Sequence, residues 1–462
     1  MYSVPLPVVN KSPIANLDTD MLVDILSHLH PLDLLTVRQT CQSLSRLTYT
    51  RSLWVNAVKA SSPNAPALAA TNPLSKLQTS ELEQLALKPY RFSKNIVQPK
   101  PQVKAVKVLS CPHEENVYSR LHKLLPGGRW LLRADNKGSL KLFDLHGNAS
   151  QLDCVSEMVI DGEISDIQTQ VHPCGNTAAV LVCSLNRLDA PPHPERMTVV
   201  TLDLSQPTPA FKEVTSYPFV DDFGRIQCGT IRGDLVATTS VNGSVLIWNW
   251  VEDSWVEIVD AGRRARHADL RVKFTGEDCV TTFDMMGGHG KTYPIPPLQP
   301  RQGNQRPQEV MIQPQGKPIG RTSGFFSSMI PSPENTDVAI LASARQVAFI
   351  SSSTSESGEK NFDTSLQVPW TRSYLSSAHK AVTSKTIDGA LVVMINSSSQ
   401  QGEPLEIHVL RDGKATSLFN VPLPWIVAPT GPAAWKVAMC PIAGTVCMIN
   451  PDGDVHVFDF AL

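Results

Sequence analysis

A glycine-rich segment at residues 287–292, with the sequence GGHGKT, comes closest to a site for phosphate chemistry. The backbone N–H groups of such a loop bind phosphate oxygens when the loop leads into a helix. Here Met285 stands where the first glycine of that pattern is required, and the residues that follow, YPIPP at 293–297, cannot begin a helix. We therefore interpret the segment as a loop between β-strands.

A basic cluster lies just before that segment and is the densest in the chain. Guanidinium groups bind phosphates and carboxylates through paired hydrogen bonds, so the cluster is a candidate contact for a protein partner. The alternative is a loop whose charges are simply solvated. The candidate residues are Arg263, Arg264, Arg266 and Arg271.

Catalytic and metal-binding patterns are not distinguishable in this sequence. The nine cysteines never form a C-x-x-C pair, so we interpret them as buried free thiols rather than metal ligands or disulfides. No Ser/His/Asp set or carboxylate pair stands out among 12 histidines and 43 acidic residues. The sequence therefore predicts a protein that is not an enzyme and needs no cofactor or metal.

The charge balance and the N-terminus restrict the partners and the compartment. A net charge of −2 and a pI near 6.6 supply no positive field for nucleic acid or an anionic membrane surface. No apolar run approaches about 18 residues, and the first 20 residues lack the pattern of a secretory signal. We expect a protein of the cytoplasm and/or the nucleus that is not secreted and binds neither nucleic acid nor membrane.

The elements that must position any binding residues begin with short helices over residues 17–60. Apolar residues recur at helical spacing from Leu22 to Leu29, and Pro31 separates this helix from the next. Three or four amphipathic helices are predicted, with Trp54 filling their junction. A bundle this small buries little surface, so we expect it to complete its core against a partner or against the rest of the chain.

This region resembles an F-box. The resemblance is carried by the run LDTDMLVDILSHLHPLDLLTVRQTC at 17–41, followed by Leu44 and Leu53-Trp54. It implies docking on a Skp-type adaptor and, through it, on a cullin-RING ligase. The expected adaptor-binding residues are Leu17, Leu22, Ile25, Leu26, Leu29, Leu32, Leu34, Leu35 and Trp54. The alternative is an ordinary helical cap on the β domain.

Residues 61–99 are predicted to be a linker that contains one short helix. The first part is rich in Pro, Ala, Asn and Ser and shows no regular period. A capping box formed by Ser80 and Glu83 is expected to begin the helix, and Pro89 is expected to follow its end. Residues 1–16 are predicted to be disordered.

Residues 100–462 contain an internal repeat that predicts the architecture. Three octapeptides align without a gap: GSLKLFDL at 138–145, GSVLIWNW at 243–250 and GDVHVFDF at 453–460. Their glycines are separated by 105 (243 − 138) and 210 (453 − 243) residues. Half of 105, about 52 residues, suits one propeller blade. Weaker copies occur at 198–204 and 405–410, where this spacing predicts them.

The fold class expected is therefore mainly β, with a WD-repeat-like β-propeller of about seven four-stranded blades behind the helical module. Six blades, or a β-sandwich pair, are the alternatives. A strand near 103–109 is expected to complete the last blade, so that the two ends of the domain close the ring. Residues 298–322, poor in apolar side chains, are predicted to form a mobile loop.

Together these patterns favour a substrate-recruiting F-box subunit of an SCF-type ubiquitin ligase, with its client on the propeller. The runner-up is a propeller scaffold without ubiquitin chemistry, whose helices are a structural cap. An enzyme with a site in the central channel would need convergent acids or histidines on inner strands, and the aligned repeats show none.

Overall fold

The computed structural model describes residues 17–60, 68–69, 71–72, 74–98, 101–111, 119–147, 150–172, 176–185, 195–219, 226–240, 242–261, 270–275, 278–284, 289–303, 307–319, 328–330, 338–342, 346–354, 360–369, 381–385, 391–395, 405–411, 414–421, 436–450 and 453–461. The predicted disorder of residues 1–16 falls outside these ranges.

Four short helices precede the linker, as the apolar spacing predicts. They are α1 (Thr19–Ser27), α2 (Pro31–Arg38), α3 (Gln42–Leu47) and α4 (Arg51–Ala60). Pro31 occupies the first turn of α2, where its missing N–H costs no hydrogen bond. The imidazole Nδ1 of His30 accepts the N–H of Leu32 at 3.2 Å, which caps the same helix.

The linker helix is longer than predicted. A 3₁₀ turn, η2 (Leu74–Lys76), precedes α6 (Thr79–Ile96), which continues through Pro89. The capping carboxylate is that of Glu81, which accepts the N–H of Gln78 at 2.6 Å, so the expected Ser80–Glu83 box is wrong. Phe92 and Ile96 are fully buried beyond the proline, and this burial offsets the cost of Pro89 inside the helix.

The described strands form seven sheets, antiparallel except where β18 joins β13, and each sheet is a blade numbered here in chain order. From the innermost strand outward, blade 1 consists of β2 (Ser119–Leu124), β3 (Trp130–Asp135), β4 (Ser139–Asp144) and β5 (Asp153–Val159). Blade 2 consists of β6 (Glu163–Val171), β7 (Thr177–Leu185), β8 (Arg196–Asp203) and β9 (Phe211–Pro218). Blade 3 consists of β10 (Ile226–Arg232), β11 (Leu235–Ser240), β12 (Val245–Asn249) and β13 (Ser254–Asp260), and β17 (Gln299–Pro300) and β18 (Glu309–Ile312) add to its outer edge. Blade 4 is β14 (Leu270–Thr275), β15 (Cys279–Asp284), β16 (His289–Pro294) and β19 (Gln315–Ile319); blade 5 is β20 (Ser328–Ile330), β21 (Val338–Ala342), β22 (Gln346–Thr354) and β23 (Lys360–Pro369); blade 6 is β24 (Ala381–Lys385), β25 (Leu391–Ile395), β26 (Leu405–Arg411) and β27 (Lys414–Val421); blade 7 is β28 (Lys436–Cys440), β29 (Thr445–Ile449), β30 (Val455–Asp459) and β1 (Lys104–Leu109), with the turn η4 (Pro441–Ala443) between β28 and β29.

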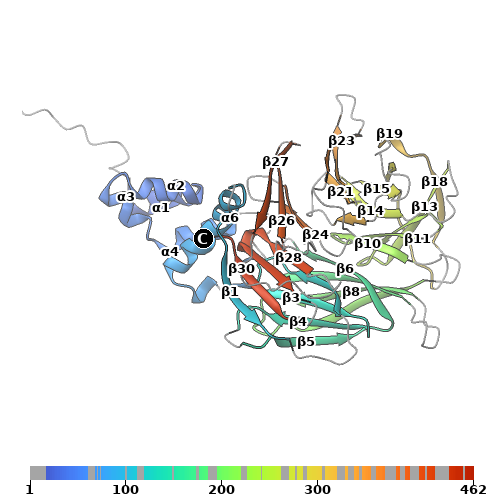
Figure 1. Cartoon of the computed structure of the whole chain (residues 1–462), viewed down its shortest axis with the longest axis horizontal. Coiled ribbons are helices and arrows are strands. Elements are labelled where there is room, and N and C mark those ends of the chain that lie inside the picture. Colours follow the sequence, from blue (N-terminus) through green and yellow to red (C-terminus); the bar gives the residue numbers. More distant parts are fainter. Residues whose placement is uncertain are drawn as a thin grey trace, which may run out of the picture.

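Contacts between neighbouring blades run around a closed circuit. The inner strand β2 contacts both β6 and β28, β10 contacts β6 and β14, and β24 contacts β20 and β28, while β19 and β23 join blades 4 and 5. The result is a propeller-like ring of four-stranded sheets, as the repeat predicts (Figure 1). Ring closure leaves each sheet with only short edges that the neighbouring blades protect.

The strand β1 closes this ring as expected. It pairs with β30 from Lys104 opposite Asp459 to Leu109 opposite Val455. The first strand after the linker and the last strand of the chain thus share one blade, and Figure 1 shows them side by side. The linker therefore enters the propeller at its point of closure.

The glycine repeat marks equivalent turns. Gly138, Gly243 and Gly453 have φ of +84°, +83° and +95°, and each lies between the second and third strands of its blade. They belong to blades 1, 3 and 7, so 105 residues is two blades and 210 is four. The weaker copies at 198–204 and 405–410 coincide with the third strands β8 and β26.

The predicted mobile loop at 298–322 is largely ordered instead. Its β17 pairs antiparallel and its β18 parallel with the outer edge of β13, before β19 returns to blade 4. The guanidinium carbon of Arg301 lies 5.2 Å from the ring centre of Tyr217 and 5.6 Å from that of Trp255. The unpaired edge of β13 supplies hydrogen-bonding groups that local composition does not reveal, which explains the wrong expectation.

Candidate functional site

The helical module shares one continuous core with the linker and the propeller. Leu34 and Trp54 are buried in a cluster that also contains Leu82 of α6 and, farther on, Leu131 and Phe143 of blade 1. The inward side of the small bundle is therefore covered by its own chain. In Figure 1, α4 and α6 lie between the other helices and the propeller.

This burial changes the role of three expected adaptor-binding residues. Leu26, Leu34 and Trp54 are 4%, 1% and 0% exposed, so none of them presents a surface to another protein. They stabilise the module from inside, and we correct their assignment accordingly. The linker, which includes α6, packs against these side chains, whereas the sequence analysis expected a partner protein to pack against them.

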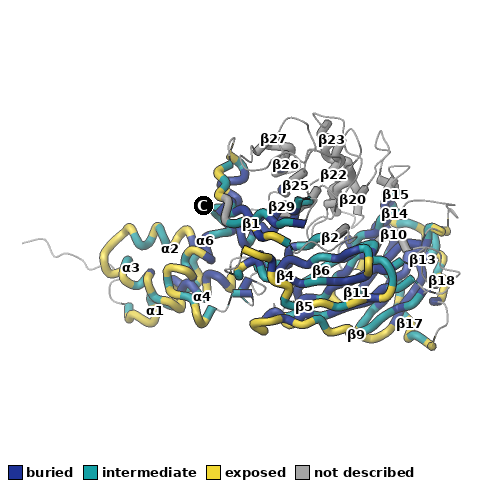
Figure 2. The backbone as a smooth tube through the Cα atoms, turned by 60° about the horizontal axis from the view of Figure 1, so that its bottom comes forward, coloured by how far each residue is buried: buried dark blue, intermediate teal, exposed yellow. Residues whose placement is uncertain are grey.

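The outward side carries exposed apolar residues. Met21 and Ile25, 54% and 49% exposed, are four residues apart on α1 and so share a face, and Leu32 at the start of α2 is 45% exposed. We call Met21, Ile25 and Leu32 the outer apolar patch. Figure 2 shows much of α1 and α3 exposed at the end of the molecule farthest from the propeller.

The remaining expected contacts are intermediate. Leu17, Leu22, Leu29 and Leu35 are half-buried, and the last two pack against the shared core. Sequence reasoning missed two exposed apolar side chains, Met21 and Tyr49. The position of Met21, one helical turn before Ile25, was a signal that could have found it.

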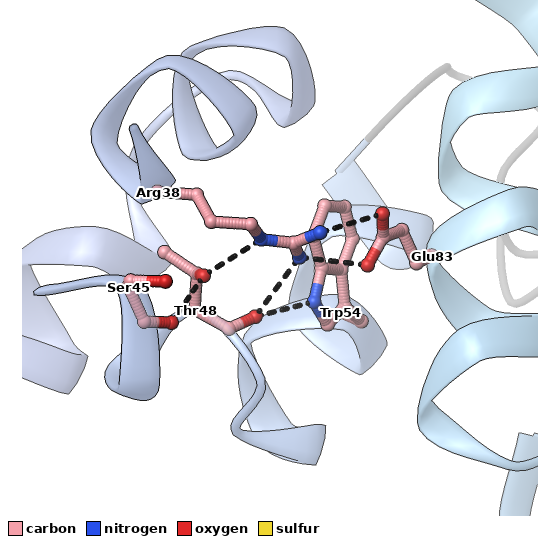
Figure 3. A network of polar contacts seen from close by, with 5 residues as sticks. All are labelled: Arg38, Ser45, Thr48, Trp54 and Glu83. Carbon is pink, nitrogen blue, oxygen red and sulfur yellow. Dashed lines mark hydrogen bonds and ion pairs between the residues drawn. The ribbon is translucent and has the colours of Figure 1, made fainter. Parts of the chain in front are cut away.

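A polar network ties the module to the linker helix (Figure 3). The guanidinium of Arg38 at the end of α2 donates to both carboxylate oxygens of Glu83 on α6, at 3.0 and 2.7 Å. Its Nε donates to the hydroxyl of Thr48 at 2.9 Å, and the Thr48 carbonyl accepts the indole N–H of Trp54 at 2.7 Å. The hydrogen bond with Glu83 raises the pKa of Arg38.

Two further contacts join the module to the linker. The rings of His30 and Tyr90 meet edge-on with centroids 4.2 Å apart. Arg51 of α4 donates to the carbonyl of Leu74 and, at 3.4 Å, to that of Leu77. Both ends of α2 and the start of α4 are thus held by residues 74–90.

The linker in turn is fastened to the propeller. The buried amide of Asn95 donates to the carbonyls of Gln102 at 2.6 Å and Phe460 at 2.8 Å and accepts the Gln102 N–H at 2.8 Å. Arg129 pairs with Asp144 at 2.7 Å and donates to the carbonyl of Thr71 at 3.3 Å.

The basic cluster is described only at its end. Arg263, Arg264 and Arg266 lie outside the described residues, and Arg271 is half-buried on β14. In the glycine-rich segment, Lys291 and Thr292 belong to β16, and the Thr292 hydroxyl is 2.8 Å from that of Thr281. The residues that follow the glycines are therefore strand, which agrees with the rejection of a phosphate loop.

The described part of the chain contains no group of three His, Cys, Asp or Glu residues placed to hold a metal ion, and none of its helices is long and apolar enough to cross a membrane. Cys183, Cys440 and Cys447 are buried free thiols, whereas Cys41 and Cys154 are exposed, contrary to the expectation of buried thiols.

Comparison with known proteins identifies the helical module alone. Residues 14–59 match the F-box-like family model, a span that includes α1–α3 and nearly all of α4. No curated protein matches the chain. The outer apolar patch lies within the matched span.

Proposed function

We propose that this chain is the substrate-recruiting F-box subunit of an SCF-type E3 ubiquitin ligase, acting in the cytoplasm and/or the nucleus. The F-box-like match supports the ligase role. In the proposal, the outer apolar patch and its half-buried neighbours dock on a Skp-type adaptor that connects to a cullin-RING ligase. The propeller holds the client, and the chain itself performs no reaction.

One observation carries this proposal: large apolar side chains, among them Met21, Ile25 and Leu32, remain exposed inside the F-box-like span. The inward side of the module packs on the linker and on itself through buried leucines. Exposed apolar side chains that lie together on a surface are typical of a protein interface. Their position at the end remote from the propeller leaves room for a large partner.

In the proposal, the client binds to the propeller. Arg263, Arg264, Arg266 and Arg271 remain candidate contacts for an acidic or phosphorylated segment of a client. The strands β13 and β14 that flank them belong to blades 3 and 4, whereas α6 packs against η4 of blade 7. Adaptor and client would then occupy separate parts of the chain.

A scaffold without ubiquitin chemistry is the second candidate. The continuous core from α1 to blade 1 favours it, because a purely structural cap would pack in this way. The outer apolar patch argues against it, since a cap has no reason to expose such residues. Affinity capture of the full-length protein separates the two: a ligase subunit brings down adaptor and cullin in near-equal amounts, and a scaffold brings down neither.

The direct test changes the patch alone. Replacing both Ile25 and Leu32 by aspartate should reduce adaptor binding at least 100-fold, because each substitution places a charge in an apolar interface. Isothermal titration calorimetry with purified Skp-type adaptor measures the dissociation constant of the double variant. Leu29 is left intact because it packs against the shared core, so its replacement would damage the module itself.

The matched control is Val159→Asp on β5, which is 73% exposed and remote from the helices. It should leave adaptor binding unchanged. Wild-type affinity in the Ile25/Leu32 double variant, with its thermal unfolding unaltered, would remove the patch from the proposal.

A further inference from the structure

The contacts between α2 and α6 lie at opposite ends of α2. His30, the capping residue, meets Tyr90, and Arg38, the last residue, meets Glu83. The chain positions increase along α2 while they decrease along α6, so the two helices run antiparallel. At about 1.5 Å per residue, the two contacts are roughly 10 Å apart. Helix α2 is therefore held at two points rather than hinged at one.

One residue of the outer apolar patch, Leu32, lies between these points. Leu32 is exposed and Leu34 is buried, two positions apart and so on opposite sides of the helix. The same helix thus presents one side outward while its other side is fixed to α6. Any loosening of the α2–α6 contact would move the outward side as well.

We propose that Arg38 and Glu83 are positioning residues: their ion pair holds the docking face in its binding conformation, at a fixed orientation to the propeller, before any adaptor arrives. The effect of the ion pair on adaptor binding rests on the proposed function. Its effect on the order of the helices is independent of that function. Neither residue belongs to the outer apolar patch, and both are half-buried with side chains 18% and 20% exposed.

The geometry requires arginine in particular. Three nitrogens of one guanidinium donate to Glu83 and to the Thr48 hydroxyl, and the same group lies 4.3 Å from the ring centre of Tyr49. Lysine keeps the charge but cannot donate to both partners in this planar arrangement. The contact with Thr48 also connects the pair to Trp54 through the shared Thr48 carbonyl.

Preorganisation has a measurable consequence. If only a fraction of molecules holds the docking face correctly, the apparent dissociation constant rises by the inverse of that fraction. Breaking the pair should therefore weaken adaptor binding although no contact residue changes. It should also increase local opening of α2 and α3 when no adaptor is present.

The first arm of the test is hydrogen exchange on the full-length protein alone. Arg38→Ala and Glu83→Ala should increase exchange over residues 31–47 roughly tenfold or more, since each leaves a half-buried charge without its partner. Arg38→Lys should show a smaller increase, and the exchanged pair Arg38→Glu with Glu83→Arg should recover part of the protection. Arg46→Ala, an exposed arginine on α3, is the matched control and should exchange as wild type.

Unchanged exchange in all of these variants would overturn the proposal. In the same experiment, exchange protection of the propeller strands shows whether a variant has kept its fold. If Glu83→Ala does not keep its fold, Glu83→Gln offers a milder change.

The second arm measures adaptor affinity for the same variants. Arg38→Ala should weaken binding by the inverse of the fraction of molecules that still hold the docking face in its binding conformation, with partial rescue by the exchanged pair. Wild-type affinity in a variant whose residues 31–47 have lost most of their exchange protection would refute preorganisation. A wild-type chain that binds no adaptor would instead refute the proposed function, while the exchange result would still decide whether the pair orders the helices.

Discussion

Gly138 illustrates how one residue determines a turn of the propeller. It joins β3 to β4 with φ of +84°, and a Cβ at this position would lie 2.3 Å from the carbonyl oxygen of Ile160 and 2.4 Å from that of Gly162. Both obstructing atoms are backbone and cannot move aside without disturbing the entry to blade 2. The glycine is therefore required by conformation and by close approach.

Alanine at Gly138 should be clearly more destabilising than alanine at Gly233, which also has a positive φ (+56°) but has no other atom within 4 Å of the position its Cβ would occupy. The Gly233→Ala change should cost about 1–2 kcal/mol of backbone strain, and Gly138→Ala should add roughly 2 kcal/mol or more for the clash. Thermal unfolding of the two variants measures the difference. Equal melting temperatures of the two variants would contradict a clash between a Cβ at position 138 and the backbone carbonyl oxygens.

At the scale of elements, α6 is the part on which the site depends. It contacts α2 through Glu83 and Tyr90. Near its C-terminal end it is fixed to the propeller by Asn95 and by Phe92, whose ring lies 6.2 Å from that of Phe460. A buried amide with three hydrogen bonds specifies one position for the helix end. The orientation of the module thus depends on few residues.

Removal of the Asn95 side chain should release the C-terminal part of α6. Asn95→Ala leaves the Gln102 N–H and the Phe460 carbonyl without this partner, which costs about 2–3 kcal/mol. Hydrogen exchange over residues 79–96 should increase, while Asn56→Ala at an exposed position of α4 should have no effect. If the two variants behave alike, Asn95 does not fasten the helix.

At the scale of the whole molecule, the helices and the propeller form one unit because they share a core. Leu53 and Trp54 are fully buried in the cluster that extends to blade 1. The chain therefore completes the core of its own F-box-like module, and under the proposed function an adaptor would bind an outer surface rather than complete a core. This is the main revision that the structure makes to the expectation from the sequence.

A fragment of residues 17–60 should consequently fail to fold alone. Without residues 68–96 its buried leucines would face water, and a bundle this small cannot offset the chain entropy. Far-UV circular dichroism should show little helix, and Trp54, the sole tryptophan in this fragment, should emit like a solvated indole. Cooperative thermal unfolding of the fragment would show that the shared core is dispensable.

Local and repeating patterns sufficed to predict the helices over 17–60, the spacing of the blades, the glycine turns and the closing strand β1. These features depend on periodicity and turn chemistry within a few residues, or on repetition of one such unit, and both are visible in a single sequence. The apolar spacing also singled out Ile25 and Leu32 as candidate contact residues, and both are exposed in the structure.

Only the tertiary structure decided which of those apolar residues are core and which are surface. Leu26 and Leu34 look like Ile25 and Leu32 in the sequence, and they differ because α6 covers one side of the helices. The pairing of Arg38 with Glu83, the continuation of α6 past Pro89 and the attachment of β17 and β18 to β13 depend likewise on surfaces formed by distant residues. Burial is a property of what packs against a residue, and the spacing of residues along one helix carries no information about that.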